Sequence, residues 1–322
     1  MTLEQFINQW QSPSPTLLVH TSGSTGKPKP MLVEKRRMEA SARITCQFLG
    51  LNRGDTALLC MPLDYIAGKM MVVRSLQRDL RLTTVRPSSH PLADDALPSF
   101  TFAAMVPMQV YNTLKVPCER ERLMHIHHLI IGGGAISDEL AQMIKPLPNA
   151  VWSTYGMTET LSHIALRRLN GPDASLWYTP FDGVGISLNA DGCLVIDAPE
   201  VCAEPLVTND IAQLRTDDRT GKTLFRIKGR KDNVVCSGGI KIQIEEVEET
   251  LRPHLSAPFM IVKKQDEMLG EKAILLTESA DLTHIEEICR NTLPKYWVPR
   301  EFLHIDHLPL TETGKPKRSG AF

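Results

Sequence analysis

The chain carries a polar stretch close to its start that decides how the rest is interpreted: Thr21, Ser22, Gly23, Ser24, Thr25, Gly26, Lys27, Pro28 and Lys29. Two short apolar runs flank it, Leu17–Val19 and Met31–Val33, and both are typical of strands. Glycines let the backbone approach an anion closely, while hydroxyls, backbone N–H groups and an ammonium supply donors and charge. The stretch therefore predicts a phosphate-binding loop.

This loop is not of the Walker type, GxxxxGK followed by Ser or Thr. Thr21 stands where that pattern needs its first glycine, and Pro28 stands where it needs a hydroxyl. The plain alternative is a polar loop without a ligand, which the hydroxyl-rich order ending in Lys-Pro-Lys disfavours.

Strand-like and helix-like segments alternate outward from the loop, up to the charged turn at Lys228–Asp232. The expected strands are Ala57–Met61, Thr101–Met105, His128–Ile131 and Ala150–Thr154, and the expected helices include Arg36–Leu49 and Ile66–Leu80. Such alternation predicts an α/β fold with a mostly parallel sheet and helices on both faces.

The pattern changes near Leu224, where a smaller α+β unit is expected to begin. Ile244–Leu251 is an amphipathic helix, and Asp281 caps a second helix that ends before Pro294. We therefore expect a large domain of residues 1–229 and a small domain of residues 230–322.

Composition excludes several classes of function. The chain has 322 residues, 42% of them apolar and 23% charged, with a net charge of -1, so no basic field favours nucleic acid. No apolar run is long enough for a membrane span, and the N-terminus lacks the pattern of a signal peptide. The seven cysteines form no CxxC pair, which favours a reduced, cytoplasmic location.

Two further motifs carry chemistry. Tyr155-Gly156-Met157-Thr158-Glu159 joins an aromatic ring suited to stack on a purine with a hydroxyl and a carboxylate suited to phosphate and Mg²⁺. Ile131-Gly132-Gly133-Gly134-Ala135 follows a buried strand and allows close backbone approach. Taken alone, each is also compatible with an ordinary strand end or tight turn.

Together these motifs resemble, in sequence order, those of the adenylate-forming superfamily of acyl- and aryl-CoA ligases, adenylation domains and luciferases. The resemblance implies that residues 21–27 bind the ATP phosphates, that Gly133, Gly134, Ala135, Tyr155 and Gly156 line the adenine and acyl pockets, and that Thr158 and Glu159 contact phosphate and Mg²⁺. It covers nearly the whole chain, residues 16–318.

The resemblance extends into the C-terminal part. Asp210, in Thr208-Asn209-Asp210, and Arg230 correspond to ribose-binding positions, and Asp232 corresponds to the hinge of a mobile small domain. Lys315, in the PxTxxGK segment from Pro309, corresponds to the catalytic lysine, with Lys317 as its nearest competitor. Ser237, Gly238 and Gly239 match the loop that lines the CoA tunnel in CoA ligases.

Two features depart from the family pattern. Family members usually carry a large segment before the phosphate loop, so the large domain is expected to be truncated at its N-terminus, and a homodimer would cover the exposed surface. Around the acyl site stands Pro62-Leu63-Asp64-Tyr65-Ile66-Ala67-Gly68-Lys69, which with Arg74 and His163 most resembles short bacterial o-succinylbenzoate–CoA ligases of menaquinone synthesis. That substrate has a second carboxylate, for which Lys69 is the first candidate partner and His163 the second, while Tyr65 would guard the pocket.

The expected function is therefore an AMP-forming acid–CoA ligase that uses ATP, Mg²⁺ and CoA. Two alternatives stay open: an adenylating enzyme that loads a carrier protein or serves another acyl or aryl acid, and a nucleotide-binding protein without catalysis. An intact lysine segment and an intact Tyr155–Glu159 motif disfavour the second.

Overall fold

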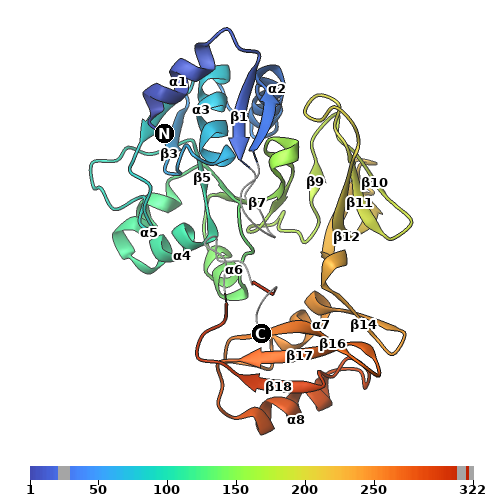
Figure 1. The fold of residues 1–322 in the computed structure, drawn as a ribbon. Helices are drawn as coiled ribbons and strands as arrows, with labels where there is room; N and C mark the ends of the chain where they lie inside the picture. Colours follow the sequence, from blue (N-terminus) through green and yellow to red (C-terminus); the bar gives the residue numbers. More distant parts are fainter. Residues whose placement is uncertain (21–29, 310–316, 319–322) are drawn as a thin grey trace. The chain divides into compact units, whose positions relative to one another are not determined.

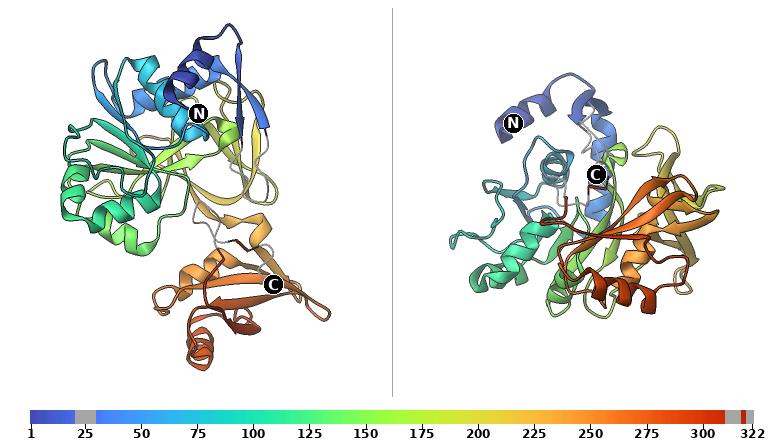
Figure 2. Two further views of the ribbon diagram at one scale, coloured as in Figure 1. Left: turned by 60° about the vertical axis from the view of Figure 1, so that its left-hand side comes forward. Right: turned by 60° about the horizontal axis from the view of Figure 1, so that its bottom comes forward.

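The computed structural model describes residues 1–20, 30–309 and 317–318. Figure 1 shows the fold, and Figure 2 shows it in two further views. The chain forms two compact units. The larger comprises Met1–Ile186, Ile196–Leu206 and Leu214–Phe225, and the smaller comprises Ser187–Val195, Val207–Gln213 and Arg226–Phe322. The smaller unit thus includes two segments upstream of the expected boundary, and the domains 1–229 and 230–322 with a hinge at Asp232 stay a prediction.

A seven-stranded sheet organises the larger unit, in the order β4-β3-β5-β6-β7-β8-β9. The first five strands in this order, β4, β3, β5, β6 and β7, pair in parallel. Strand β8 is antiparallel to β7, and β9 is antiparallel to β8. The strands are β3 (Thr56–Leu59), β4 (Arg81–Thr84), β5 (Phe102–Met105), β6 (His128–Ile131), β7 (Ala150–Gly156), β8 (His163–Arg168) and β9 (Thr179–Pro180). The expected α/β fold with a mostly parallel sheet is confirmed.

Helices cover both faces of this sheet. The chain moves one way along the sheet from β3 to β4 and the other way from β5 to β7, and right-handed crossovers then place the connecting helices on opposite faces. Figures 1 and 2 accordingly show α2 and α3 grouped apart from α4, α5 and α6. The bounds are α1 (Leu3–Gln11), α2 (Lys35–Phe48), α3 (Ile66–Arg78), α4 (Pro107–Lys115), α5 (Pro117–Met124) and α6 (Asp138–Ile144).

The strands that flank the expected phosphate loop form a separate two-stranded antiparallel hairpin, β1 (Thr16–His20) and β2 (Pro30–Glu34). Val19 and Val33 are buried, whereas Leu18 and Leu32 pair directly across the strands and are 51% and 68% exposed. Covering of this apolar pair by a second copy of the chain stays a prediction.

Residues 163–230 form strands rather than strand–helix units. Beyond β8 and β9 they build a four-stranded sheet in the order β10-β11-β12-β13, through which the division between the two units passes. Its strands are β10 (Gly185–Leu188), β11 (Cys193–Asp197), β12 (Leu206–Thr216) and β13 (Thr223–Arg230). The short 3-10 turn η2 (Lys231–Asn233) follows β13.

The smaller unit has its own core. Its sheet runs β15-β14-β17-β16, with β18 parallel to β17, and α7 and α8 complete it. One apolar cluster includes Val247 and Leu251 of α7, and a second, formed by Met260, Val262, Ile274 and Leu276, packs against Ile305 and Leu308. The bounds are β14 (Val234–Ser237), β15 (Ile240–Gln243), α7 (Ile244–Leu251), β16 (Phe259–Asp266), β17 (Gly270–Thr277), α8 (Leu282–Thr292) and β18 (Glu301–His304).

Candidate active site

The topology of the large sheet marks one edge for ligand binding. The strand order reverses between β3 and β5, and in open α/β sheets ligands bind at such a switch point, beyond the carboxyl ends of the strands. Tyr65 and Lys69 follow β3, the glycine segment follows β6, and Tyr155 to Glu159 end or follow β7. Parallel strands therefore bring three stretches that are far apart in sequence to the same edge.

The glycine segment after β6 is shaped by its neighbour β7. A Cβ on Gly132 would overlap the Oγ1 of Thr154, so only glycine fits beside that strand. The Gly132 amide donates to the Met105 carbonyl oxygen of β5 at 3.1 Å. Gly133 has a φ of 81°, a left-handed conformation that glycine adopts without strain. Gly133 and Ala135 are exposed and Gly134 is partly exposed, which leaves backbone accessible to a ligand.

The end of β7 turns sharply after Tyr155. A Cβ on Gly156 would overlap the Ser162 carbonyl oxygen, and the next residues form the one-turn 3-10 helix η1 (Thr158–Thr160). The Thr160 Oγ1 accepts from the Met157 amide at 2.9 Å, which fixes this turn. Thr158 is buried, whereas the Glu159 side chain is exposed. The turn thus presents a carboxylate to solvent from a rigid base.

An aromatic cluster holds Tyr155. Its ring lies 5.0 Å from that of Phe225 and 5.7 Å from that of Tyr178, and Tyr178 and Phe225 stack on each other at 5.3 Å. The Ser153 Oγ and the Tyr178 hydroxyl are 2.9 Å apart. The Tyr155 ring meets the rings of Tyr178 and Phe225 at steep angles, 56° and 76°, so these two side chains hold its orientation. An aromatic ring held in this way suits stacking on a purine. Sequence reasoning missed Tyr178 and Phe225, because neither stands in a recognisable motif.

His163 lies in a buried hydrogen-bond chain that sets its protonation. Arg74 donates to the Ser162 Oγ at 2.6 Å, and Ser162 lies 3.2 Å from His163 Nδ1. On the other side, Thr45 donates to the Ser41 carbonyl, so its Oγ1 accepts from His163 Nε2 at 3.1 Å. A neutral imidazole with its proton on Nε2 satisfies this order, because the Ser162 hydroxyl then donates to Nδ1.

Burial acts on both basic groups of this chain in the same direction. Burial first, and the nearby Arg74 cation second, hold the pKa of His163 well below its usual value. Burial also lowers the pKa of Arg74 to about 10, so the guanidinium stays charged at neutral pH. Both ring nitrogens of His163 are engaged within the protein, which leaves this second candidate for the substrate carboxylate no nitrogen to spare.

Tyr65 and Lys69 stand at the start of α3. Tyr65 precedes the helix and is 45% exposed, and Lys69 lies within the first turns and is buried. The Lys69 Nζ donates to the Asp64 carbonyl oxygen at 3.3 Å, and burial lowers the pKa of this lysine. The Asp64 carboxylate partly opposes this effect, and a further anion beside the buried ammonium would oppose it as well.

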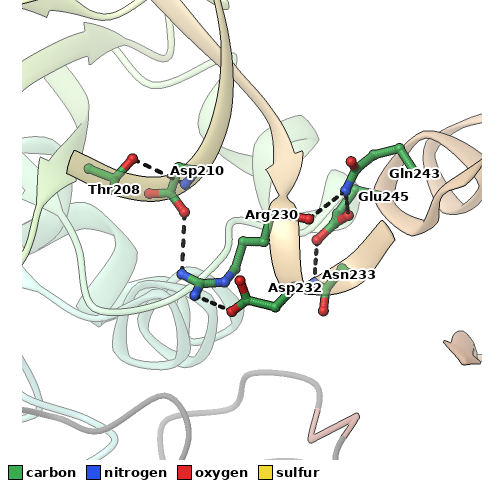
Figure 3. A network of polar contacts seen from close by, with 7 residues as sticks. All are labelled: Thr208, Asp210, Arg230, Asp232, Asn233, Gln243 and Glu245. Carbon is green, nitrogen blue, oxygen red and sulfur yellow. Dashed lines mark hydrogen bonds and ion pairs between the residues drawn. The ribbon is translucent and has the colours of Figure 1, made fainter. Parts of the chain in front are cut away.

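Within the smaller unit, Arg230 joins the two predicted carboxylates (Figure 3). Its Nη1 lies 3.3 Å from Asp210 Oδ1, and its Nη2 lies 2.5 Å from Asp232 Oδ2. The Asp210 amide donates to Thr208 Oγ1 at 3.1 Å, which holds the backbone of that strand. The structure therefore brings the ribose and hinge candidates into one network.

A second part of this network braces the turn after β13. Gln243 Nε2 donates to the Arg230 carbonyl oxygen at 3.1 Å and also contacts Glu245, whose Oε1 accepts from Asn233 Nδ2 at 2.5 Å (Figure 3). A Cβ on Gly229 would lie 2.6 Å from Glu245 Oε2, so a larger residue there would displace this side chain from the network. Sequence reasoning missed Gln243 and Glu245, which carried no signal beyond their place at a helix start.

Ser237, Gly238 and Gly239 form the end of the β14–β15 hairpin. Ser237 pairs with Ile240, and the two glycines between them have φ of 56° and 83°. Two successive positive φ values define the tight hairpin turn that suits the twist of the strands. Turn geometry alone thus explains the two glycines, and their role in binding CoA stays a proposal.

A family model described as AMP-binding enzyme matches residues 4–203. The chain belongs to the AMP-binding enzyme family. The 2-succinylbenzoate–CoA ligase of Bacillus mycoides (strain KBAB4) is 26% identical over 92% of this chain and 68% of its own length. The ligase of the same name from Bacillus cereus (strain AH820) is 25% identical over 92% of this chain and 67% of its own.

Solved structures support the same fold. The acyl-CoA synthetase (AMP-forming)/AMP-acid ligase II-like protein from Dyadobacter fermentans DSM 18053 is 33% identical, with a TM-score of 0.68 over 98% of this chain and 91% of that chain. The o-succinylbenzoate coenzyme A synthetase from Bacillus subtilis, in complex with ATP and magnesium ion, is 23% identical, with a TM-score of 0.73 over 94% and 69%. At that identity the second likeness speaks for fold alone.

Two predicted elements of this AMP-binding enzyme lie outside the described residues. They are the phosphate loop (Thr21, Ser22, Gly23, Ser24, Thr25, Gly26 and Lys27) and Lys315. The hairpin pairing His20 with Pro30 does show that the loop begins and ends at neighbouring positions. Lys317 and Arg318 are described, next to the lysine segment.

The part of the chain that the structure describes contains no group of three His, Cys, Asp or Glu side chains able to hold a metal ion. A single exposed carboxylate such as Glu159 nevertheless fits Mg²⁺ that arrives with a nucleotide, because Mg²⁺ takes its other oxygens from phosphate and water. No described helix combines the length and apolar character that crossing a membrane would require.

Proposed function

We propose that this AMP-binding enzyme is an AMP-forming acid–CoA ligase that acts on a dicarboxylic acid of the o-succinylbenzoate kind, as in menaquinone biosynthesis. The observation that carries the proposal is the shared sheet edge. The Tyr155 ring, the glycine segment, the exposed Glu159 and the buried Lys69 all end or follow strands of one sheet. The names of the curated relatives support the same substrate class.

In the first half-reaction the substrate carboxylate attacks the α-phosphorus of ATP and pyrophosphate leaves. Tyr155 carries the adenine, Asp210 and Arg230 hold the ribose, and residues 21–27 hold the phosphates. Lys315 stabilises the charge that develops between carboxylate and phosphate. Mg²⁺, held by Glu159 together with phosphate and water oxygens, would neutralise phosphate charge.

In the second half-reaction the CoA thiolate attacks the acyl-adenylate and AMP leaves. We assign Ser237, Gly238 and Gly239 to the approach of CoA, after a rotation about Asp232 that exchanges them for Lys315. Such alternation lets one site serve two steps with different needs.

The second carboxylate of the acid would lie beside Lys69. This ammonium is buried after β3, and its hydrogen bond goes to a neutral carbonyl, so a substrate anion would compensate its charge. Tyr65, exposed directly before the same helix, stands where it can guard the entrance.

The test is pyrophosphate release with a panel of aromatic and aliphatic acids, with and without CoA. We expect o-succinylbenzoate to give the highest kcat/KM and a CoA thioester as product. Acid-dependent pyrophosphate release without thioester would favour a carrier protein as acceptor. No pyrophosphate release with any acid would contradict the proposed function.

A further inference from the structure

A buried ion pair ties the last described residues to helix α7. Arg318 Nη2 lies 2.6 Å from Glu248 Oε2, and the two side chains are 16% and 11% exposed. The other carboxylate oxygen, Oε1, accepts from the Ile261 amide of strand β16 at 2.7 Å. Glu248 therefore holds a helix, a strand and the C-terminal segment at one point.

The chain is also fixed on the other side of residues 310–316. The Leu308 amide donates to Glu278 Oε1 at 2.9 Å, and the Leu308 side chain packs on the Met260 cluster of the sheet. The Lys317 amide donates to the Pro309 carbonyl oxygen at 2.8 Å, so the two ends of the segment meet. The described residues on both sides of the stretch that contains Lys315 are thus anchored on the smaller unit.

Stability alone does not account for a buried ion pair at this place. Removing two charges from water is costly, and apolar residues of similar size stabilise a core at least as well. A guanidinium–carboxylate pair does offer a fixed direction, which apolar contacts lack. Fixed direction matters next to a catalytic group, because a misplacement of about 1 Å can cost roughly 100-fold in rate.

We infer that Glu248 and Arg318 are positioning residues for adenylation, which anchor the C-terminal side of the lysine segment on the smaller unit. Neither residue touches substrate. The inference rests on the proposed function, in which Lys315 serves the first half-reaction and not the second.

The experiment compares the two half-reactions in Glu248→Gln, Arg318→Met and Arg318→Lys. We expect Glu248→Gln and Arg318→Met to lower kcat for pyrophosphate release on the order of 100-fold, with KM for ATP little changed. Thioester formation from supplied acyl-adenylate and CoA should stay near the wild-type rate. Arg318→Lys keeps the charge and should recover part of the loss. The double variant Glu248→Gln/Arg318→Met should lose no more kcat than the more impaired of the two single variants, because both substitutions remove the same contact.

The matched control is Glu301→Gln, which removes the partner of Lys272 at 2.5 Å elsewhere in the same unit. It should lower both half-reactions equally or neither. An equal loss of both half-reactions in the Glu248 and Arg318 variants, or no loss in either, would overturn the inference. If Glu248→Gln does not fold, the two Arg318 variants carry the same comparison.

Hydrogen exchange separates this inference from the proposed function. In Glu248→Gln the Lys317 amide should lose protection, while the amides of β17 keep theirs. Unchanged protection of Lys317 would overturn the anchor whatever the enzyme's activity, whereas an inactive wild-type protein with the expected exchange pattern would contradict only the proposed function.

Discussion

Acidification should destabilise the larger unit through His163. Ser162 and Thr45 engage its two nitrogens in an order that a neutral imidazole satisfies. Burial and the Arg74 cation oppose protonation as well, and they hold the pKa of His163 well below its usual value. In the unfolded chain the same side chain titrates near its ordinary pKa of about 6.5.

The sign follows from which state binds the proton. With the folded pKa below the unfolded one, the unfolded chain takes up a proton that the folded chain does not, so stability falls as the pH drops below about 7. The slope approaches about 1.4 kcal/mol per pH unit for one such group. Between pH 7 and pH 5 the loss from His163 alone comes to about 2 kcal/mol. That corresponds to a Tm lower by about 4–8 °C for a unit of this size.

The assay is thermal and urea unfolding of wild type and His163→Gln between pH 7 and pH 5. We expect the variant to be less stable at pH 7 but to have a flatter pH profile by about 2 kcal/mol. His128→Gln is the matched control, because burial first, with His127 second, also lowers the pKa of His128, to about 4. His128 is only partly buried, so solvent screening makes its share smaller. Parallel profiles for wild type and His163→Gln would refute the assigned protonation state.

Three further changes probe the site. Gly132→Ala should destabilise the protein by about 1–3 kcal/mol and slow pyrophosphate release, because its Cβ would overlap Thr154. The double variant Gly132→Ala/Thr154→Ala should recover both stability and rate, and failure to recover them would contradict the crowding argument. Phe225→Leu removes the ring beside Tyr155, and a loss of roughly 1.4 kcal/mol in binding should raise the Kd for AMP, measured by calorimetry, about tenfold. An unchanged Kd would rule the cluster out as part of the adenine site. Lys69→Met should raise KM for o-succinylbenzoate about tenfold, because a charge-assisted hydrogen bond of roughly 1.5 kcal/mol to the second carboxylate is lost. KM for benzoate should stay unchanged, and equal effects on both acids would contradict the proposed contact of Lys69 with that carboxylate.

Short-range pattern sufficed for most elements of the fold. The expected helix at Ile244–Leu251 matches α7, and Asp281 caps α8 by accepting from the His284 amide at 3.0 Å. The strand at His128–Ile131 matches β6, because a buried parallel strand is an unbroken apolar run. Residues 163–230 were less predictable, since antiparallel strands joined without helices carry a weak periodic signal.

The site was predictable only as far as its motifs extend along the chain. The segments after β6 and β7 meet because carboxyl ends of parallel strands share an edge, and that much follows from the sequence. Thr45 lies on α2 and Arg74 on α3, and both belong to the hydrogen-bond chain of His163. No motif connects these two residues in the sequence. Tyr178, directly before β9, and Phe225, in β13, likewise reach Tyr155 from segments that are distant in sequence.

The two ion-pair sets of the smaller unit differ in how easily they can rearrange. Arg230 and Asp232 are 36% and 41% exposed, so water can replace the contact between them, and a pair of this kind is worth at most about 1 kcal/mol. Breaking the buried Glu248–Arg318 pair from one side would cost about 3–5 kcal/mol, because the other charge is left without a partner. The rotation that we propose between the two half-reactions would therefore be cheap at residues 230–232 and expensive at the C-terminal anchor. This difference favours Asp232 as the hinge, and it means that the lysine segment should travel with α7 rather than independently of it.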